Sequence, residues 1–189
     1  MVASDRMSAN RRNFLALAGA AAVTPVVRAQ GANSPKLRIL VLHGPNLDIL
    51  GRREPQIYGS TTLAQINETL QVLAKEINVE LIAMQSNEEG ALVNAFHAHM
   101  DDADAALINA AGYSFNSVAI HDAIKAMPFP VIEVHISNLG QRDEIHQHSI
   151  LTPAVRGTVM GLGTHSYTAA LRAVAEIVRE ERAAKKAKG

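Results

Sequence analysis

Five short apolar runs alternate along this chain with longer amphipathic segments, and this alternation constrains the fold more than any other feature. The runs lie at residues 37–44, 79–86, 105–112, 130–137 and 157–163. The first, LRILVLHG, is almost continuously apolar, which is typical of a strand buried on both faces of a parallel sheet. The pattern therefore predicts an α/β fold, in which right-handed crossovers join a five-stranded parallel sheet with helices on both faces.

Four longer segments with apolar residues at helical spacing separate or follow these runs. We expect Thr61 or Thr62 to cap the first of these helices and Asn87 to cap the second. The third is predicted over Ser114–Met127, and the last begins at about Thr164. In such a sheet, ligands bind at the carboxyl ends of the strands, close to the point where the strand order reverses. The loops that follow the strands therefore hold the candidate functional residues.

Composition excludes several classes of protein. Of the 189 residues 48% are hydrophobic, which suffices for a packed core and excludes a disordered or fibrous chain. The absence of cysteine excludes disulfides, thiolate nucleophiles, zinc ribbons and iron–sulfur clusters. With 18 basic and 18 acidic residues, the chain has no overall basic field, and we expect no nucleic-acid partner.

The first 29 residues differ in character from the rest. Arg11 and Arg12 precede a mildly apolar, alanine-rich run over residues 14–27, and small residues suit cleavage after Ala29. This stretch resembles a twin-arginine export signal, and the alternative is a cytoplasmic extension. The apolar run is shorter than the roughly 20 residues that span a bilayer, so no stable membrane anchor is expected. We therefore expect a periplasmic protein that consists of a single domain over residues 30–189 and is acidic once the signal is removed.

The loop after the first apolar run carries Asn46, Arg53 and Tyr58. At about 18 residues it exceeds the usual connection between a strand and a helix, and such loops are usually functional or disordered. A guanidinium next to a tyrosine stabilises the phenolate, which is a base. Tyr58 is therefore a candidate base with Arg53 as the cation that stabilises its phenolate, and the alternative is that both are ordinary surface residues.

The fourth apolar run contains a second candidate pair. Glu133 and His135 lie on one face of the predicted strand by its period of two. The carboxylate can hold one ring nitrogen and leave the other as a general acid, although a hydrogen-bonded structural histidine is the alternative. The backbone N–H groups of Ile136 and Ser137 suit a carboxylate ligand.

Three further possibilities stay open at this point. Asn109, at the end of the third run, is either a hydroxyl-binding amide or an ordinary loop residue, and Asp122 on the following helix is by itself a plausible solvent-exposed residue. The possibility of a metal site comes from His135, His146 and His148, but their spacing is loose and no other ligand motif accompanies them.

Several motifs together resemble one known family. They are GPNLDILGRREPQIYGSTTLAQI, QSNEEGALVNAFHAH, SVAIHDA, EVHISN and GLGTHSYTAAL, and they span nearly all of residues 37–175. In order and spacing they are similar to the type II 3-dehydroquinate dehydratases. The resemblance implies a flavodoxin-like fold and a lyase that eliminates water from 3-dehydroquinate through an enolate, without metal or cofactor.

The resemblance also implies roles for individual residues. Tyr58 would be the base, assisted by Arg53, and Asn46 would face the enolate oxygen. His135 would be the acid, oriented by Glu133.

Four further residues would bind the substrate: Asn109, Ile136, Ser137, and Asp122 from a neighbouring subunit. The implied assembly is a homo-oligomer of trimers, up to a dodecamer.

Four residues depart from the family's pattern, in which we expect Asn at His43, His at Phe115, and Arg at His121 and His146. The positions of Phe115 and His146 normally contact substrate hydroxyls, so the departures concern the substrate rather than the reaction. Export further favours quinate breakdown over biosynthesis. The alternatives are a lyase on a related cyclic hydroxy acid, or a non-catalytic periplasmic binding protein for a quinate-like carboxylate.

Overall fold

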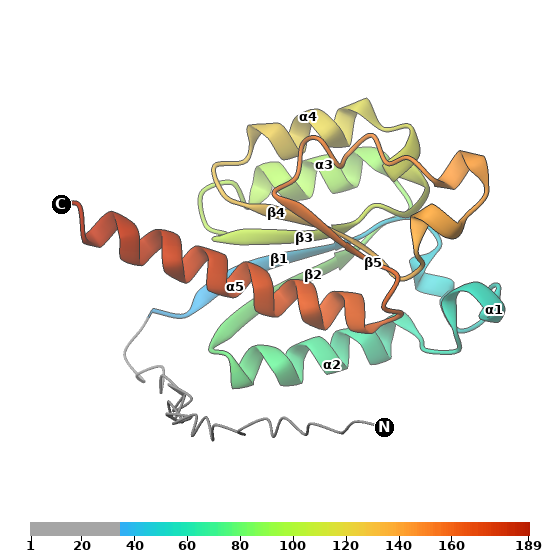
Figure 1. Cartoon of the computed structure of the whole chain (residues 1–189), viewed down its shortest axis with the longest axis horizontal. Helices are drawn as coiled ribbons and strands as arrows, with labels where there is room; N and C mark the ends of the chain where they lie inside the picture. Colours follow the sequence, from blue (N-terminus) through green and yellow to red (C-terminus); the bar gives the residue numbers. More distant parts are fainter. Residues whose placement is uncertain (1–34) are drawn as a thin grey trace, which may run out of the picture. The chain divides into compact units, whose positions relative to one another are not determined.

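The computed structural model describes residues 35–189, and five parallel strands form their centre (Figure 1). The strands are β1 (Leu37–His43), β2 (Val79–Gln85), β3 (Ala105–Asn109), β4 (Val131–His135) and β5 (Gly157–Met160). Their order across the sheet is β2-β1-β3-β4-β5, so β1 and β3 are neighbours and the order reverses between them. This is the flavodoxin-like arrangement, and it confirms the predicted fold class. The predicted signal peptide over residues 1–29 lies outside the described residues.

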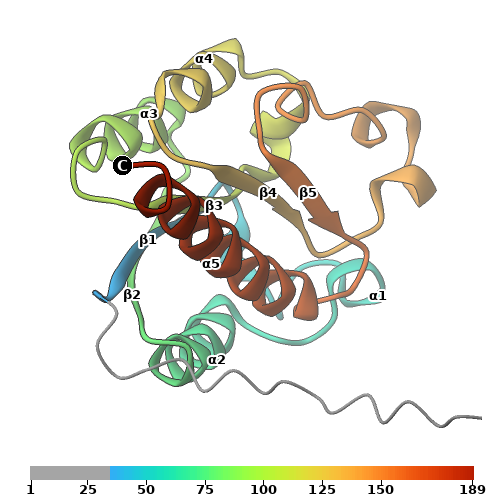
Figure 2. The same ribbon diagram turned by 60° about the vertical axis from the view of Figure 1, so that its left-hand side comes forward.

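Helices cover both faces of the sheet, as predicted. Helices α2 (Leu63–Glu76) and α5 (His165–Lys186) pack on one face, and α3 (Glu89–Ala98) and α4 (Val118–Ala126) on the other (Figures 1 and 2). Side chains of β1 alternate between them, because successive residues of a strand point to opposite faces. Ile39 and Val41 join the core beneath α2 and α5, and Leu40 and Leu42 join the core beneath α3 and α4.

The start of α2 follows the prediction. Thr62 is its N-cap, its hydroxyl accepts the backbone N–H of Gln65, and the Gln65 side chain accepts the backbone N–H of Thr62. This capping box satisfies two of the N–H groups that the first turn of a helix leaves without partners. The local sequence is therefore sufficient to fix the beginning of this helix.

The predicted starts of the next two helices are wrong. The N-cap of α3 is Glu88 and not Asn87. The side-chain oxygen of Asn87 accepts the backbone N–H of Asn46 instead of an N–H of the helix. Helix α4 begins only after Ser117, whose hydroxyl accepts the N–H of Ile120. The residues before it form a separate 3₁₀-helix, η2 (Ala111–Phe115).

The long loop after β1 contains a short helix, α1 (Pro55–Tyr58), that the sequence patterns did not indicate. Figures 1 and 2 both show α1 beside the loop that joins β4 to β5. Within residues 35–189, no helix combines the length and the apolar character needed to cross a membrane.

Where β1 and β3 end, their backbones approach closely. The N–H of Gly44 donates to the carbonyl of Asn109 at 2.7 Å, and a Cβ on Gly44 would lie 2.5 Å from the carbonyl oxygen of Ala110. A side chain at this position would therefore push the two strand ends apart.

We predict that Gly44→Ala destabilises the fold, because the added methyl group meets backbone atoms that cannot move independently. Overpacking of this kind typically costs about 1–3 kcal/mol of unfolding free energy. Gly90→Ala is the matched control: its Cβ would have no neighbour within 4 Å, and alanine favours a helix over glycine by about 1 kcal/mol. Urea unfolding of both variants tests this, and equal stability of the two would contradict it.

Candidate active site

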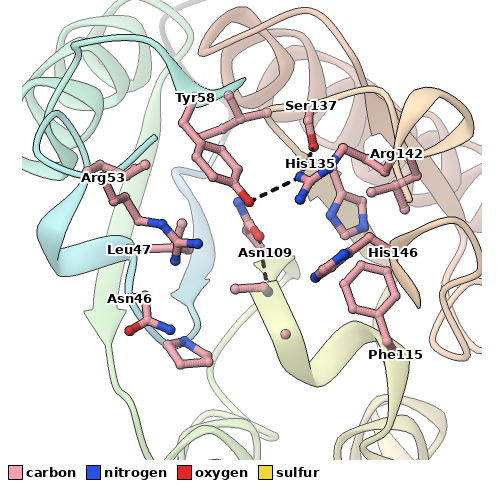
Figure 3. A pocket seen from close by; sticks show the side chains of 16 residues that line it. Asn46, Leu47, Arg53, Tyr58, Asn109, Phe115, His135, Ser137, Arg142 and His146 are labelled. Carbon is pink, nitrogen blue, oxygen red and sulfur yellow. Dashed lines mark hydrogen bonds between the residues drawn. The ribbon is translucent and has the colours of Figure 1, made fainter. Parts of the chain in front are cut away.

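A pocket lies at the carboxyl ends of β1, β3 and β4, where the reversed strand order was expected to create a binding site (Figure 3). It brings together all the sequence-predicted site residues except Glu133 and Asp122. These lining residues are Asn46, Arg53, Tyr58, Asn109, His135, Ile136 and Ser137. They come from strand ends and loops far apart in the sequence, and the sheet brings them together.

Tyr58 lies between two arginines. The guanidinium of Arg53 lies over its ring, with Cζ 4.9 Å from the ring centroid, and also pairs with the Glu54 carboxylate at 2.7 Å. The phenolic oxygen accepts a hydrogen bond from Arg142 at 3.1 Å (Figure 3). In this structure, therefore, the direct donor to the phenolic oxygen is Arg142, and Arg53 acts through the ring face.

Arg142 is the main site residue that the sequence analysis missed. It lies in the loop after β4, and its guanidinium also donates to the Ser137 hydroxyl at 3.2 Å. The available signal was its place in a loop at the carboxyl end of a strand, but charged residues are common in such loops. Only the path of this loop towards α1 brings Arg142 to Tyr58.

Glu133 and His135 form the buried pair that the strand period predicts. The ring Nε2 of His135 donates to the Glu133 carboxylate at 2.9 Å, and both side chains are at most 5% exposed. Nδ1 is thus the ring nitrogen left to meet a substrate, because His135 itself lines the pocket. The carboxylate thereby fixes the orientation of the imidazole towards the pocket.

The Glu133 carboxylate accepts three more hydrogen bonds, from hydroxyl groups. Its donors are Ser149 at 2.5 Å, Thr152 at 2.8 Å and Thr158 at 3.3 Å. Burial opposes ionisation of this carboxyl, but the hydrogen bonds from His135 and Ser149 outweigh it and hold the pKa of Glu133 below its ordinary value. Glu133 is therefore ionised at neutral pH and accepts from all four donors.

Two pocket residues have left-handed backbones that are unusual outside glycine. Asn46 has φ 64° and Ala111 has φ 50°. The N–H of Asn46 donates to Asn87 at 2.8 Å, and the N–H of Ala111 donates to the Asn109 side chain at 3.2 Å. Such conformations persist only when the surroundings hold them, and they gather at binding sites.

One wall of the pocket differs in character from the rest. Phe115 and His146 lie edge to face, with ring centroids 5.0 Å apart (Figure 3). Phe115 offers no hydrogen bond, and Nδ1 of His146 is engaged by the Asp143 carboxylate. The wall therefore presents one aromatic face and one remaining imidazole nitrogen.

Asp122 lies outside this pocket. It is on α4, its side chain is 71% exposed, and it pairs with the neighbouring His121 at 3.0 Å. Of the three histidines considered for a metal site, His135 and His146 line the pocket, whereas His148 is exposed. Across residues 35–189, no group of three or more His, Asp or Glu side chains is arranged to hold a metal ion.

The arrangement is suited to acid–base chemistry on an anionic substrate. Tyr58 supplies a phenol in contact with two guanidinium groups, and His135 supplies an imidazole held by a carboxylate. The backbone N–H groups after β4 and the two guanidinium groups suit a carboxylate ligand.

Comparison with known proteins agrees with this geometry. The sequence model of the family described as dehydroquinase class II matches residues 37–175. The 3-dehydroquinate dehydratase of Bordetella pertussis is 55% identical over 136 residues, which are 71% of this chain and 94% of that protein. The one from Pelotomaculum thermopropionicum is 45% identical over 141 residues, covering 75% and 98% of the two chains.

A solved structure has the same fold. The type II dehydroquinase from Propionibacterium acnes superposes with a TM-score of 0.72 at 40% identity, over 75% of this chain and 99% of that one. Because the family motifs, the strand order and the composition of the pocket all agree, the chain belongs to the class II dehydroquinase family.

Proposed function

We propose that this chain is an exported 3-dehydroquinate dehydratase that acts in quinate breakdown in the periplasm. The observation that carries the reaction is the position of Tyr58 between Arg53 and Arg142, in one pocket with a His135 that Glu133 holds. The match covers almost the whole length of the relatives that carry this name, and this supports the same reaction here.

The reaction is a β-elimination, which needs a base, a stabiliser for the enolate and an acid for the departing hydroxyl. The Tyr58 phenolate removes the proton α to the ketone, and the electron pair of that C–H bond forms the enolate. Asn46 lies in the pocket with its left-handed backbone fixed, where it can face the enolate oxygen. The enolate then re-forms the ketone as the C–O bond breaks, and His135 protonates the leaving hydroxyl. The products are water and the conjugated enone, 3-dehydroshikimate.

Export is proposed from the sequence. Arg11 and Arg12 precede a weakly apolar run that ends at a site suited to cleavage after Ala29. A dehydratase outside the cytoplasm meets quinate-derived substrate that enters the cell, rather than the intermediates of biosynthesis. This supports a role in breakdown.

Assembly is proposed from Asp122. This carboxylate belongs to the substrate site by resemblance, yet it is exposed and lies outside the pocket of its own chain. It can reach a pocket only from a neighbouring copy. We therefore infer a homo-oligomer, built of trimers and up to a dodecamer.

The wall of Phe115 and His146 favours a second candidate, a lyase of the same mechanism on a related cyclic hydroxy acid. The family pattern would place a histidine and an arginine there, which offer more hydrogen-bond donors. Phe115 offers none, and His146 shares its Nδ1 with Asp143. A substrate with a less polar edge at this wall would fit without unpaired hydroxyls.

The first prediction tests the acid and the base. Tyr58→Phe removes the phenolic oxygen and keeps the ring, so the fold should survive while dehydration collapses. His135→Ala should also cripple the reaction, because a general acid commonly contributes about 10²–10⁴-fold. The assay follows the ultraviolet absorbance of the enone with purified mature protein. Near wild-type rates in either folded variant would refute these roles, and wild-type binding without turnover would favour a binding protein.

A second prediction concerns location. Replacing Arg11 and Arg12 by lysine keeps the positive charges but removes the twin-arginine pair, so full-length precursor should accumulate in the cytoplasm. Wild-type protein should appear in the periplasm, beginning near Gln30. Fractionation with N-terminal sequencing decides this, and uncleaved wild-type protein in the cytosol would overturn the proposal.

A third prediction separates the two substrates. If the substrate is dehydroquinate, the double variant Phe115→His, His146→Arg should raise kcat/KM roughly tenfold or more, because one or two hydrogen bonds of about 1 kcal/mol are regained. If the pocket is shaped for a less polar relative, wild type should prefer that relative and the double variant should reverse the preference. A fall in dehydroquinate turnover, with the fold intact by circular dichroism, would show that this wall is adapted to dehydroquinate as it stands.

A further inference from the structure

A buried histidine that the proposed reaction does not use lies behind the pocket. His43 is the last residue of β1, and its side chain is fully buried. Both ring nitrogens have partners: Nδ1 lies 3.1 Å from the Tyr167 hydroxyl, and Nε2 lies 3.0 Å from the side-chain oxygen of Asn67. A polar group in this position either serves the fold alone or orients something that reaches the pocket.

The partners determine which nitrogen of His43 carries the proton. The amide oxygen of Asn67 only accepts, so Nε2 carries the hydrogen and donates it. Burial lowers the pKa of His43 to about 4, although the hydrogen bond with Asn67 opposes the shift, and the ring is therefore neutral. A neutral ring with a protonated Nε2 has a lone pair on Nδ1. Nδ1 must therefore accept the hydrogen of the Tyr167 hydroxyl.

Tyr167 connects His43 to the pocket. It lies on α5 and its side chain is fully buried. Its hydroxyl oxygen accepts a hydrogen bond from Nδ2 of Asn109 at 3.0 Å. Because the hydroxyl donates its only hydrogen to His43, it can meet Asn109 only as an acceptor. The hydrogen bonds thus run in one direction, from Asn109 through Tyr167 and His43 to Asn67.

The strand geometry explains why these side chains meet. His43 points to the same face of the sheet as Ile39 and Val41, the face covered by α2 and α5. Asn109 is the register partner of His43 on β3 and points to that face as well. Tyr167, on α5, therefore lies between the last side chains of two adjacent strands.

The result is an amide that is held at both ends. Nδ2 of Asn109 donates to Tyr167, and its oxygen accepts the backbone N–H of Ala111 at 3.2 Å. A rotation of the amide by half a turn would place N–H against N–H at Ala111. Asn109 lines the pocket (Figure 3), so its orientation decides where a substrate meets a donor and where it meets an acceptor.

We propose that His43 and Tyr167 are positioning residues, which fix the amide of Asn109 for the substrate through the hydrogen-bond chain Asn109–Tyr167–His43–Asn67. The kinetic test rests on the proposed dehydration of 3-dehydroquinate, because it reads turnover of that substrate. The chain itself does not depend on which hydroxy acid the pocket takes.

Tyr167→Phe removes only the hydroxyl, and His43→Leu removes both ring nitrogens. Each should raise KM for dehydroquinate roughly tenfold with a smaller change in kcat, as expected when a binding group loses its orientation. His43→Asn should stay close to wild type, because its amide oxygen lies one bond beyond Cγ, as Nδ1 does, and can accept from Tyr167. Phe96→Leu is the control for general loss of stability, since Phe96 is fully buried in the core on the opposite face of the sheet.

A double-mutant cycle gives the decisive result. If Tyr167 acts through Asn109, then Tyr167→Phe has no further effect on KM in the Asn109→Ala background. Equal, independent effects in both backgrounds would mean that Tyr167 serves the fold alone and would overturn the proposal. An unchanged KM in folded Tyr167→Phe would overturn it as well.

Nitrogen-15 spectroscopy of the histidine rings tests the chain without turnover. In wild type, His43 should show a protonated Nε2 and an unprotonated Nδ1 at neutral pH. The signals that disappear in His43→Asn are those of His43. Tyr167→Phe and Asn109→Ala should each shift the Nδ1 signal. A protonated Nδ1, or an Nδ1 signal that is unchanged in both variants, would refute the hydrogen-bond chain. If wild type does not dehydrate dehydroquinate, the proposed function fails, and the spectra still decide this inference.

Discussion

The buried carboxylate of Glu133 forms hydrogen bonds that connect the sheet to the loop between β4 and β5, which lines part of the pocket. Its donors come from β4 itself, from the loop after it and from β5: His135, Ser149, Thr152 and Thr158. An ionised carboxylate only accepts hydrogen bonds, so each of these donors must direct its hydrogen towards Glu133. His135 thereby presents its other ring nitrogen to the pocket. Loss of the carboxylate would leave the buried N–H of His135 without its partner, which costs about 1–3 kcal/mol.

A second polar network lies on the opposite face of the same sheet. Glu133 and His135 share the face that α3 and α4 cover, whereas His43 and Asn109 share the face beneath α2 and α5. Both networks reach the pocket because all these strands are parallel and end at the same edge. The imidazole of His135 and the amide of Asn109 are therefore oriented by separate sets of contacts, and both line the one pocket at this edge of the sheet.

The two sides of the pocket differ in the chemical groups that they present. The side that carries Tyr58 holds two guanidinium groups, which suit an anionic substrate. The side of Phe115 and His146 is an aromatic contact with one imidazole nitrogen left for a ligand. Tyr58 and the two guanidinium groups thus lie on one side of the pocket, and Phe115 and His146 form another side.

The sequence by itself determined the elements whose causes are local. Apolar runs predicted the strands, and the period of two was enough to place Glu133 and His135 on one face of β4. Capping of α3 by Asn87 failed, because the N–H of Asn46, from another loop, takes its side-chain oxygen. The strand order followed from the resemblance to a family and not from the pattern of residues, whereas the contact between Tyr58 and Arg142, 84 residues apart, was decided only by the tertiary structure. Such contacts depend on how whole loops fold over the end of the sheet, and neither spacing nor residue type in a single segment carries that information.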